Sequence, residues 1–309
     1  MLTVIMCTHN GADTTGRTLE AFCGILPPAG GWKLVIVDNA SSDSTPTIIQ
    51  QFAPKLPLTV VQEPRLGLAT SQNTGISHVE GDLAVFTDDD VLPDPDWLRE
   101  WRRVAGRFPG IEIFGGTITP EYEVPPPDTI ATSSWIRMLY ACTDPTLREG
   151  PVSADEATIY GPNMAVRASA LARGCRFDDR LMSGPAGLLE NETDFVMQVA
   201  KGGAPLGFAP TARVQHIVNK KQVTWRWILS RFYRHGRTMY YFKQTSQPEF
   251  PPAIFGMPRY IVRRLAESVV MMVFVLMTFN RRRFVTLLRS AAYDLGALYQ
   301  ARNMTGNRQ

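Results

Sequence analysis

Three consecutive aspartates, Asp88, Asp89 and Asp90, follow a short apolar run at residues 83–86. The run has the length and composition of a buried strand in a parallel sheet. Ligands of open α/β sheets bind just beyond the carboxyl ends of such strands. Side chains two residues apart point the same way on an extended backbone, so Asp88 and Asp90 would offer paired carboxylates. Hard oxygen ligands suit Mg²⁺ or Mn²⁺ carrying a phosphorylated substrate, whereas the alternative is a solvated acidic turn before two prolines.

The elements that would position these acids alternate between strand and helix. The hydrophobic pattern predicts strands at 2–7, 33–37, 58–62 and 82–86, with helices at 14–22, 46–52 and 68–79 between them. This alternation predicts an α/β fold with a mostly parallel, right-handed sheet flanked by helices. A further strand is expected to begin near 115, a proline-rich loop to cover 121–128 and a last strand to run over 212–216.

Two more polar clusters follow predicted strands. Thr8, His9 and Asn10 follow the first strand, and Asp38 and Asn39 follow the second, so all should meet the acids at one edge of the sheet. A histidine ring can stack on a base, an amide or carboxylate can accept its N–H, and acids can hold ribose hydroxyls and a metal. Together they indicate a nucleotide-diphosphate site. The chain shows neither a Gly-x-Gly-x-x-Gly after its first strand nor a Gly-Lys-Ser/Thr phosphate loop, so dinucleotide and P-loop sites are disfavoured.

At this point the chain resembles family 2 of the glycosyltransferases. The resemblance covers about residues 1–215, and it rests on the order and spacing of four segments, at 4–10, 36–43, 67–76 and 87–90. It implies the GT-A fold, which is Rossmann-like, and the inverting transfer of a sugar from a nucleotide-diphosphate donor. It divides the chain into a catalytic domain, 1–215, and a basic, aromatic-rich helical extension, 216–309.

The resemblance also implies roles for individual residues. Asp88 matches the acid near the ribose, and Asp90 matches the ligand of the Mg²⁺ or Mn²⁺ cofactor. Asn39, His9 and Gln72 depart from the family pattern, because they stand where many members have Asp, Tyr and Arg. Asn73 matches the pattern, although capping a neighbouring loop would explain it equally well. The residues expected to bind the donor are Thr8, His9, Asn10, Asp38, Asn39, Asn73, Asp88 and Asp89.

The acceptor side of the site is expected in the second half of the domain. Gly161 and Asn163 resemble a family segment beside the acceptor, and a turn into a core strand is the alternative. Inversion in one displacement needs a carboxylate to take the proton of the acceptor hydroxyl. Glu192 matches that base, with Glu190 and Asp194 as alternatives. Acids in the first turn of a helix are also favoured by its dipole, which is the structural explanation.

A third metal ligand is expected at His216, which follows the last predicted strand of the domain. Its imidazole would return to the same edge of the sheet as the acids and can bind Mn²⁺. Several GT-A enzymes place a histidine after the core in this way. A single histidine is more often structural, so both interpretations are kept.

Charge is distributed unevenly along the chain. Residues 213–309 hold 17 Lys and Arg against 3 Asp and Glu, a net of +14, whereas residues 1–212 hold 15 against 26, a net of −11. An aromatic-rich helix is expected over 222–242, and the apolar run 269–279 is shorter than the roughly 20 residues that span a bilayer. We therefore expect no binding to nucleic acid and peripheral docking on an anionic membrane, at the inner face of the cell membrane. Packing of this run on the protein itself is the alternative.

The remaining features favour a folded cytoplasmic enzyme. Four cysteines without Cys-x-x-Cys spacing indicate a reducing compartment, and the first residues do not suggest a signal peptide. The leading hypothesis is a metal-dependent, inverting, hexosyltransferase-like enzyme that acts on a sugar or lipid-linked acceptor, in polysaccharide or glycolipid synthesis. The alternatives are a nucleotidyltransferase that makes a sugar nucleotide and a non-catalytic glycan-assembly protein that retains the fold.

Overall fold

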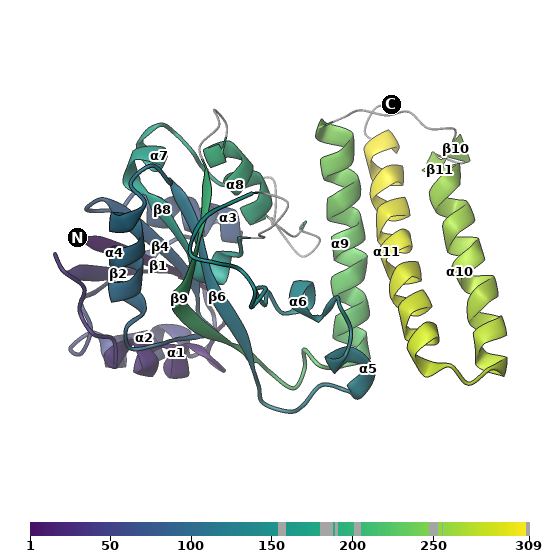
Figure 1. Cartoon of the computed structure of the whole chain (residues 1–309), viewed down its shortest axis with the longest axis horizontal. Coiled ribbons are helices and arrows are strands. Elements are labelled where there is room, and N and C mark those ends of the chain that lie inside the picture. The colour runs from purple at the N-terminus through teal and green to yellow at the C-terminus, as the bar shows by residue number, and fades with distance from the viewer. Residues whose placement is uncertain are drawn as a thin grey trace. The chain divides into compact units, whose positions relative to one another are not determined.

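The computed structural model describes residues 1–153, 159–179, 188, 191–200, 205–246, 253–254 and 256–306 (Figure 1). These residues form two compact units. The first comprises residues 1–121, 140–179 and 191–218, and the second comprises 122–139 and 219–306. The predicted boundary between residues 215 and 216 stays a prediction.

The parallel half of the first unit's sheet is built by the first strands of the chain. Its strand order is β3-β2-β1-β4, and β1 pairs in parallel with both β2 and β4. Three helices connect these strands, as the alternation predicts. The elements are β1 (Leu2–Thr8), α1 (Thr15–Cys23), β2 (Trp32–Asp38), α2 (Thr45–Phe52), β3 (Leu58–Gln62), α3 (Leu68–Ile76) and β4 (Leu83–Asp88).

The sheet continues beyond β4 in the order β8-β6-β9-β5, and β7 also pairs with β9. The pairings of β8 with β4 and β6, and of β9 with β5 and β7, are antiparallel. The α/β, GT-A type of fold is thus confirmed. The elements are β5 (Val91–Pro93), α4 (Trp97–Arg107), β6 (Ile113–Tyr122), β7 (Gly150–Val152), the 3-10 turn η1 (Gly161–Asn163), β8 (Met164–Arg167), α7 (Ala168–Ala172), α8 (Asn191–Ala200) and β9 (Leu206–Val218).

A separate apolar core covers each face of this sheet. Because side chains alternate along a strand, Val4 and Met6 of β1 lie in one core and Ile5 and Cys7 in the other. The first core also contains side chains of α1, α2 and α4, and the second contains side chains of α3, α7 and α8. Every central strand is therefore buried on both faces, and only its carboxyl end is left for a ligand.

The last strand is longer than expected. The sequence predicts it over 212–216, whereas β9 starts at Leu206 and continues to Val218. His216 lies inside β9, in register with Val91 of β5. The antiparallel partner β5 pairs with residues 214–216 of β9, a long-range pairing that the pattern of a single strand does not reveal.

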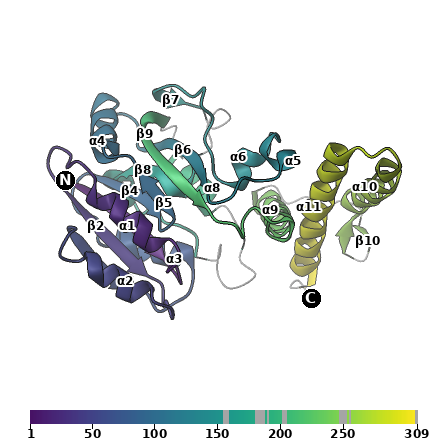
Figure 2. The ribbon, with the colours of Figure 1, turned by 90° about the horizontal axis from the view of Figure 1, so that it is seen from below.

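The second unit consists mainly of three long helices. Figures 1 and 2 show α11 between α9 and α10. The expected helix at 222–242 corresponds to α9, and the apolar run 269–279 belongs mostly to α10. No helix in the described part of the chain is long and apolar enough to cross a membrane. The elements are α5 (Asp128–Ala131), α6 (Ile136–Leu139), α9 (Trp225–Ser246), β10 (Ala253–Ile254), β11 (Met257–Pro258), α10 (Arg259–Met277) and α11 (Arg281–Gly306).

Two glycines let α9 and α11 pack closely. A Cβ on Gly236 of α9 would lie 1.9 Å from the carbonyl oxygen of Tyr293, and a Cβ on Gly296 of α11 would lie 1.9 Å from that of Tyr233. Both obstacles are backbone atoms, which cannot rotate away. The two helices can therefore approach this closely only while both positions remain glycine.

We expect Gly236→Ala to lower the free energy of unfolding by about 1–3 kcal/mol, because the added methyl group forces the two helices apart. Urea denaturation monitored by circular dichroism measures this loss. Gly106→Ala in α4 is the matched control, since a Cβ there meets nothing within 4 Å. That control should stabilise the protein by up to about 1 kcal/mol through the better helix propensity of alanine. Equal effects at the two positions would contradict the close packing.

Candidate active site

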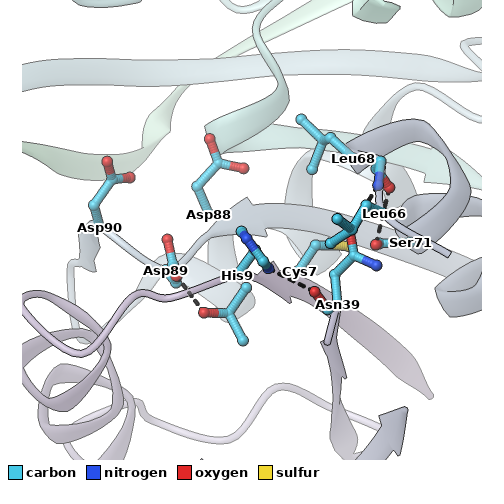
Figure 3. A pocket seen from close by; sticks show the side chains of 11 residues that line it. Cys7, His9, Asn39, Leu66, Leu68, Ser71, Asp88, Asp89 and Asp90 are labelled. Atoms are coloured by element: carbon cyan, nitrogen blue, oxygen red, sulfur yellow. Dashed lines mark hydrogen bonds between the residues drawn. The ribbon is translucent and has the colours of Figure 1, made fainter. Parts of the chain in front are cut away.

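A pocket of about 560 Å³ opens at the carboxyl ends of the parallel strands (Figure 3). Its volume is in the range of small-molecule and cofactor sites. Figure 3 shows the aspartates at one side, Asn39 with Leu66, Leu68 and Ser71 at the other, and His9 between them. The lining residues are Cys7, Thr8, His9, Asn39, Leu66, Gly67, Leu68, Ser71, Asp88, Asp89 and Asp90.

Helix α1 and the end of β1 fix the acidic turn. Thr8 donates a short hydrogen bond to Asp89 Oδ2, and Thr18 donates to the carbonyl oxygen of Asp89 at 2.9 Å. The same Thr18 hydroxyl accepts the amide N–H of Val91 at 3.2 Å. Asp89 therefore anchors the turn, while Figure 3 shows the carboxylates of Asp88 and Asp90 directed to the same side.

Asp90 and His216, two of the predicted metal ligands, lie close together. His216 Nε2 lies 3.3 Å from Asp90 Oδ2, and its Nδ1 donates to the carbonyl oxygen of Tyr140 at 2.8 Å. The other carboxylate oxygen, Asp90 Oδ1, is buried and has no hydrogen-bond partner among the described residues. Within that same set, no three His, Cys, Asp or Glu side chains lie close enough to hold a metal ion by themselves. Mg²⁺ normally takes only one or two protein carboxylates and completes its shell with substrate phosphates and water, so this donor set fits.

The electrostatics of the site show strong repulsion between its carboxylates. Burial, followed by the negative charges of Asp90 and Glu192, raises the pKa of Asp88 well above its usual value. Burial and Asp90 also raise the pKa of Asp89 to about 6, although the hydrogen bond from Thr8 opposes the shift. For His216, burial lowers the pKa, but the charge and hydrogen bond of Asp90 outweigh this effect and raise it to about 9. A cation bound beside these acids would relieve their repulsion.

The loops after β1 and β2 hold each other in place. His9 Nδ1 donates to the carbonyl oxygen of Asn39 at 2.6 Å, which leaves one face of its exposed ring toward the pocket. Asn10, at φ +54°, accepts the amide N–H groups of Ser42 and Asp43. Asp38 accepts from the amide of Ser41 and from the side chain of Gln62.

Asn39 has a bracing function at the far rim of the pocket. Its Nδ2 donates to the carbonyl oxygens of Glu63 and Arg65, and its Oδ1 accepts the amide N–H of Gly67, all at 2.8 Å. With both N–H groups used in this way, Asn39 shapes the loop that carries Leu66 into the pocket. Asn73 is likewise engaged, since its amide pairs with both the N–H and the C=O of Phe177. These contacts are the ones expected if Asn73 caps a neighbouring loop, which was the alternative explanation for this residue.

Glu63 also stabilises this rim of the pocket. Its carboxylate is 5% exposed, accepts two bonds from the Arg65 guanidinium at 3.0 Å each, and accepts one from Thr74 at 2.6 Å. These hydrogen bonds, that from Arg65 first, lower the pKa of Glu63 to about 2. The loop 63–67 is therefore fixed by a buried charged group as well as by an amide.

The predicted base, Glu192, lies in the first turn of α8 against Gly161. A Cβ on Gly161 would come within 2.7 Å of Glu192 Oε1, so the structure brings these two predicted residues together. The alternative base Asp194 accepts a hydrogen bond from Gln198, one turn further along the helix, at 2.6 Å. The other alternative, Glu190, lies outside the described residues.

Asn163 lies in the core of the first unit, and its side chain is fully buried. Its Oδ1 accepts the indole N–H of Trp97 at 2.8 Å, and its Nδ2 donates to the carbonyl oxygens of Thr117 and Ala212. These bonds link α4, β6 and β9, which favours a structural role over the predicted contact with an acceptor. The functional roles of the other site residues stay predictions.

Sequence reasoning missed the residues that support the site. A Cβ on Gly11 would lie 2.0 Å from Asp89 Oδ2, and Thr18 and Glu63 make the contacts described above. A signal was present in α1, where Thr15 and Thr18 interrupt the apolar face at helical spacing and are completely buried. Buried hydroxyl groups need hydrogen-bond partners, and the acidic turn is the partner of one of these two threonines.

Comparison with known proteins identifies the class to which this fold and site belong. Residues 3–113 match the model of the family described as Glycosyl transferase family 2, so this segment of the chain is a family 2 glycosyltransferase domain. The matched range contains the acidic turn, His9 and Asn39. This finding supports glycosyl transfer over nucleotidyl transfer.

Individual relatives are more distant. The chain is 28% identical over 125 residues to the glycosyltransferase AglE of Haloferax volcanii, covering 39% of this chain and 40% of that protein. It is 25% identical over 221 residues to the pre-mycofactocin glycosyltransferase of Mycobacterium tuberculosis, covering 70% of this chain and 42% of that protein. The chain thus spans about two fifths of the length of these relatives.

Among solved structures, the fold is similar to that of the mannosyltransferase PcManGT from Pyrobaculum calidifontis, in complex with GDP-Man and Mn²⁺. The TM-score is 0.63 at 18% identity, over 97% of this chain and 86% of that one. TarS from S. aureus, in complex with UDP-GlcNAc, has a TM-score of 0.54 at 14% identity, over 100% and 92%.

Gly11→Ala should abolish or strongly reduce transferase activity while the chain still folds, because the new methyl group would displace Asp89 and with it the acidic turn. Thermal melting and turnover of the nucleotide-sugar donor are the measurements. Gly16→Ala in the same segment is the control, since its Cβ would make only an ordinary 3.6 Å contact with Ile48. Full activity of Gly11→Ala would show that the turn does not need this support.

Glu63→Gln should destabilise the protein at neutral pH, and its effect should fade in acid. A carboxylate whose folded pKa is about 2 and whose unfolded pKa is 4.5 contributes stability above pH 4.5 and loses it as the pH falls toward 2. The expected loss near pH 7 is about 1–3 kcal/mol. Urea unfolding at pH 7 and pH 3, with the exposed Glu20→Gln as control, measures both values. A difference that is the same at both pH values would contradict the ion pair.

Proposed function

We propose that the chain is an inverting, metal-dependent glycosyltransferase that moves a sugar from a nucleotide-diphosphate donor to a hydroxyl acceptor. The observation that supports this most is the paired, same-side arrangement of Asp88 and Asp90 at the edge of a nucleotide-sized pocket, with Glu192 close enough to raise the pKa of Asp88. The GDP-Man and UDP-GlcNAc complexes of the structural relatives support a nucleotide sugar as donor.

The donor would lie along the pocket with its base at the end formed by His9, Asn39 and Leu66. The exposed imidazole face offers a stacking surface, and Leu66, 56% exposed, offers an apolar one. Asp88 would accept hydrogen bonds from the ribose hydroxyls. This orientation places the diphosphate next to Asp90 and the reacting sugar toward Gly161 and Glu192.

Asp90 would hold the Mg²⁺ or Mn²⁺ cofactor, with Asp88 or His216 as a second ligand, and phosphate oxygens and water would complete the shell. Such an ion, when bound, neutralises the charge that develops on the leaving diphosphate. His216 would have to release its Nε2 proton before that nitrogen could bind a metal. The hydrogen bond from Nδ1 to Tyr140 already directs Nε2 toward Asp90.

Glu192 would act on the acceptor. Its carboxylate takes the proton of the acceptor hydroxyl while that oxygen attacks the anomeric carbon from the face opposite the diphosphate. The new carbon–oxygen bond forms as the bond to the diphosphate breaks, and the electron pair leaves with the diphosphate. Gly161 leaves room for the Glu192 side chain to lie at this position. The acceptor that we propose is a sugar or lipid-linked hydroxyl in polysaccharide or glycolipid synthesis.

Two substitutions test these roles. Glu192→Gln should lower kcat by about 10²–10⁴-fold with little change in donor binding, because only proton removal is lost. Asp90→Asn should abolish the metal-dependent part of donor binding. Thermal shift with a panel of nucleotide sugars, with and without Mn²⁺, identifies the donor, and turnover with that donor measures the rates.

Asp194→Asn is the matched control for Glu192→Gln, since it removes a neighbouring carboxylate of the same helix turn. Wild-type turnover in Glu192→Gln together with inactivity in Asp194→Asn would show that Asp194, and not Glu192, acts as the base. Full metal-dependent transfer by Asp90→Asn would refute the metal site.

A further inference from the structure

The outer face of α10 is apolar over its last three turns. Six large side chains of this segment are 48–67% exposed, and Phe279, just after the helix, is 90% exposed. This apolar face consists of Val269, Val270, Val273, Phe274, Leu276, Met277 and Phe279. The first half of the helix differs, because there the exposed positions include the ion pair of Arg263 and Glu267.

The rotation of α10 is fixed by contacts on its other side. Ile261 and Val275 are buried, and Arg264 Nε bonds both carboxylate oxygens of Asp294 on α11, at 2.9 and 3.0 Å. Asp294 is only 1% exposed, so losing this pairing would leave a buried carboxylate without its partner. The helix therefore cannot turn its apolar face toward α11 without breaking a buried ion pair.

Positive charge is concentrated next to the apolar face. Arg281, Arg282 and Arg283 begin α11 two residues after Phe279, all are exposed, and none forms an ion pair within the described residues. Three cations in the first turn also repel the positive end of the helix dipole, so a nearby anion would stabilise this end of the unit. An apolar strip beside unpaired arginines is complementary to the interface of an anionic bilayer.

We propose that the apolar face of α10 and the arginines 281–283 together dock on an anionic phospholipid surface, with α10 lying in the plane of the interface. Its apolar segment, nine helical residues long, reaches about 14 Å, whereas the hydrocarbon core is about 30 Å thick. Insertion tip first would carry the three arginines into that core, which is costly for each of them. Lying flat, the helix buries its apolar side chains while the arginines reach the phosphates.

A second copy of this chain fits the same face less well. Two-fold dimers bring the same patch of both copies together, which would bury the apolar face, but the one acid of α10, Glu267, is already paired with Arg263 and is not available to the arginines 281–283. A lipid surface meets both the apolar and the charged requirement. The docking does not depend on the proposed reaction, and it would bring a membrane-borne acceptor within reach of a surface-bound enzyme.

Flotation of the full chain with phosphatidylcholine vesicles, with and without phosphatidylglycerol, tests the proposal. The wild type should float with anionic vesicles at low salt and should not float with neutral ones. Replacing all three arginines by glutamine should weaken partitioning on the order of 100-fold, since each cation contributes about a factor of five to binding near an anionic leaflet. Arg→Lys at the same three positions keeps the charge and should retain most of the binding.

The apolar contribution is tested by the combined Val270→Ser, Phe274→Ser and Met277→Ser variant, which should lose flotation without a drop in melting temperature. Leu295→Ser on α11 is its control, because that side chain is 50% exposed but lies outside the apolar face. Flotation that survives both sets of substitutions, or a wild type that never floats, overturns the proposal. So does a wild-type dimer in light scattering that the serine variant converts to a monomer.

Discussion

Repulsion between carboxylates that are crowded into one turn is the constraint on which the rest of the catalytic unit depends. Asp88, Asp89 and Asp90 are adjacent in the chain, and burial makes their mutual repulsion costly. The fold lowers this cost because the middle residue, Asp89, is hydrogen-bonded within the protein. Thr8 and Thr18 hold the side chain and backbone of Asp89, which leaves Asp88 and Asp90 directed together into the pocket. A cation bound between these two carboxylates would relieve their remaining repulsion.

Much of this arrangement could be predicted from local sequence. The strands ending at Thr8, Asp38 and Asp88 are short apolar runs followed by polar residues, and parallel strands bring such ends together whatever the rest of the fold does. Glu192 and Gly161 were also expected in one site, and the structure places them in contact. The strand ends could be predicted because each depends on a pattern within a few residues, whereas the functional roles of Glu192 and Gly161 stay predictions.

The predictions that failed or were missing depend on partners distant in sequence. His216 lies within β9 because β9 is still paired with β5 at this position. Asn163 looked like a residue of the acceptor site, yet Trp97, Thr117 and Ala212 occupy its amide. Nothing near residue 39 in the chain shows that Asn39 braces residues 63–67. The sequence shows an asparagine but not whether its side-chain amide forms hydrogen bonds to a ligand or to the backbone.

That brace has a consequence for how quickly a donor can bind. Asn39 and Glu63 hold the rim at residues 63–67 in its final shape, with hydrogen bonds made within the protein alone. A base arriving at this rim would not have to order the loop, so little conformational entropy would be lost there on binding. Association at the base end would then be a single encounter, limited by diffusion and orientation rather than by a folding step.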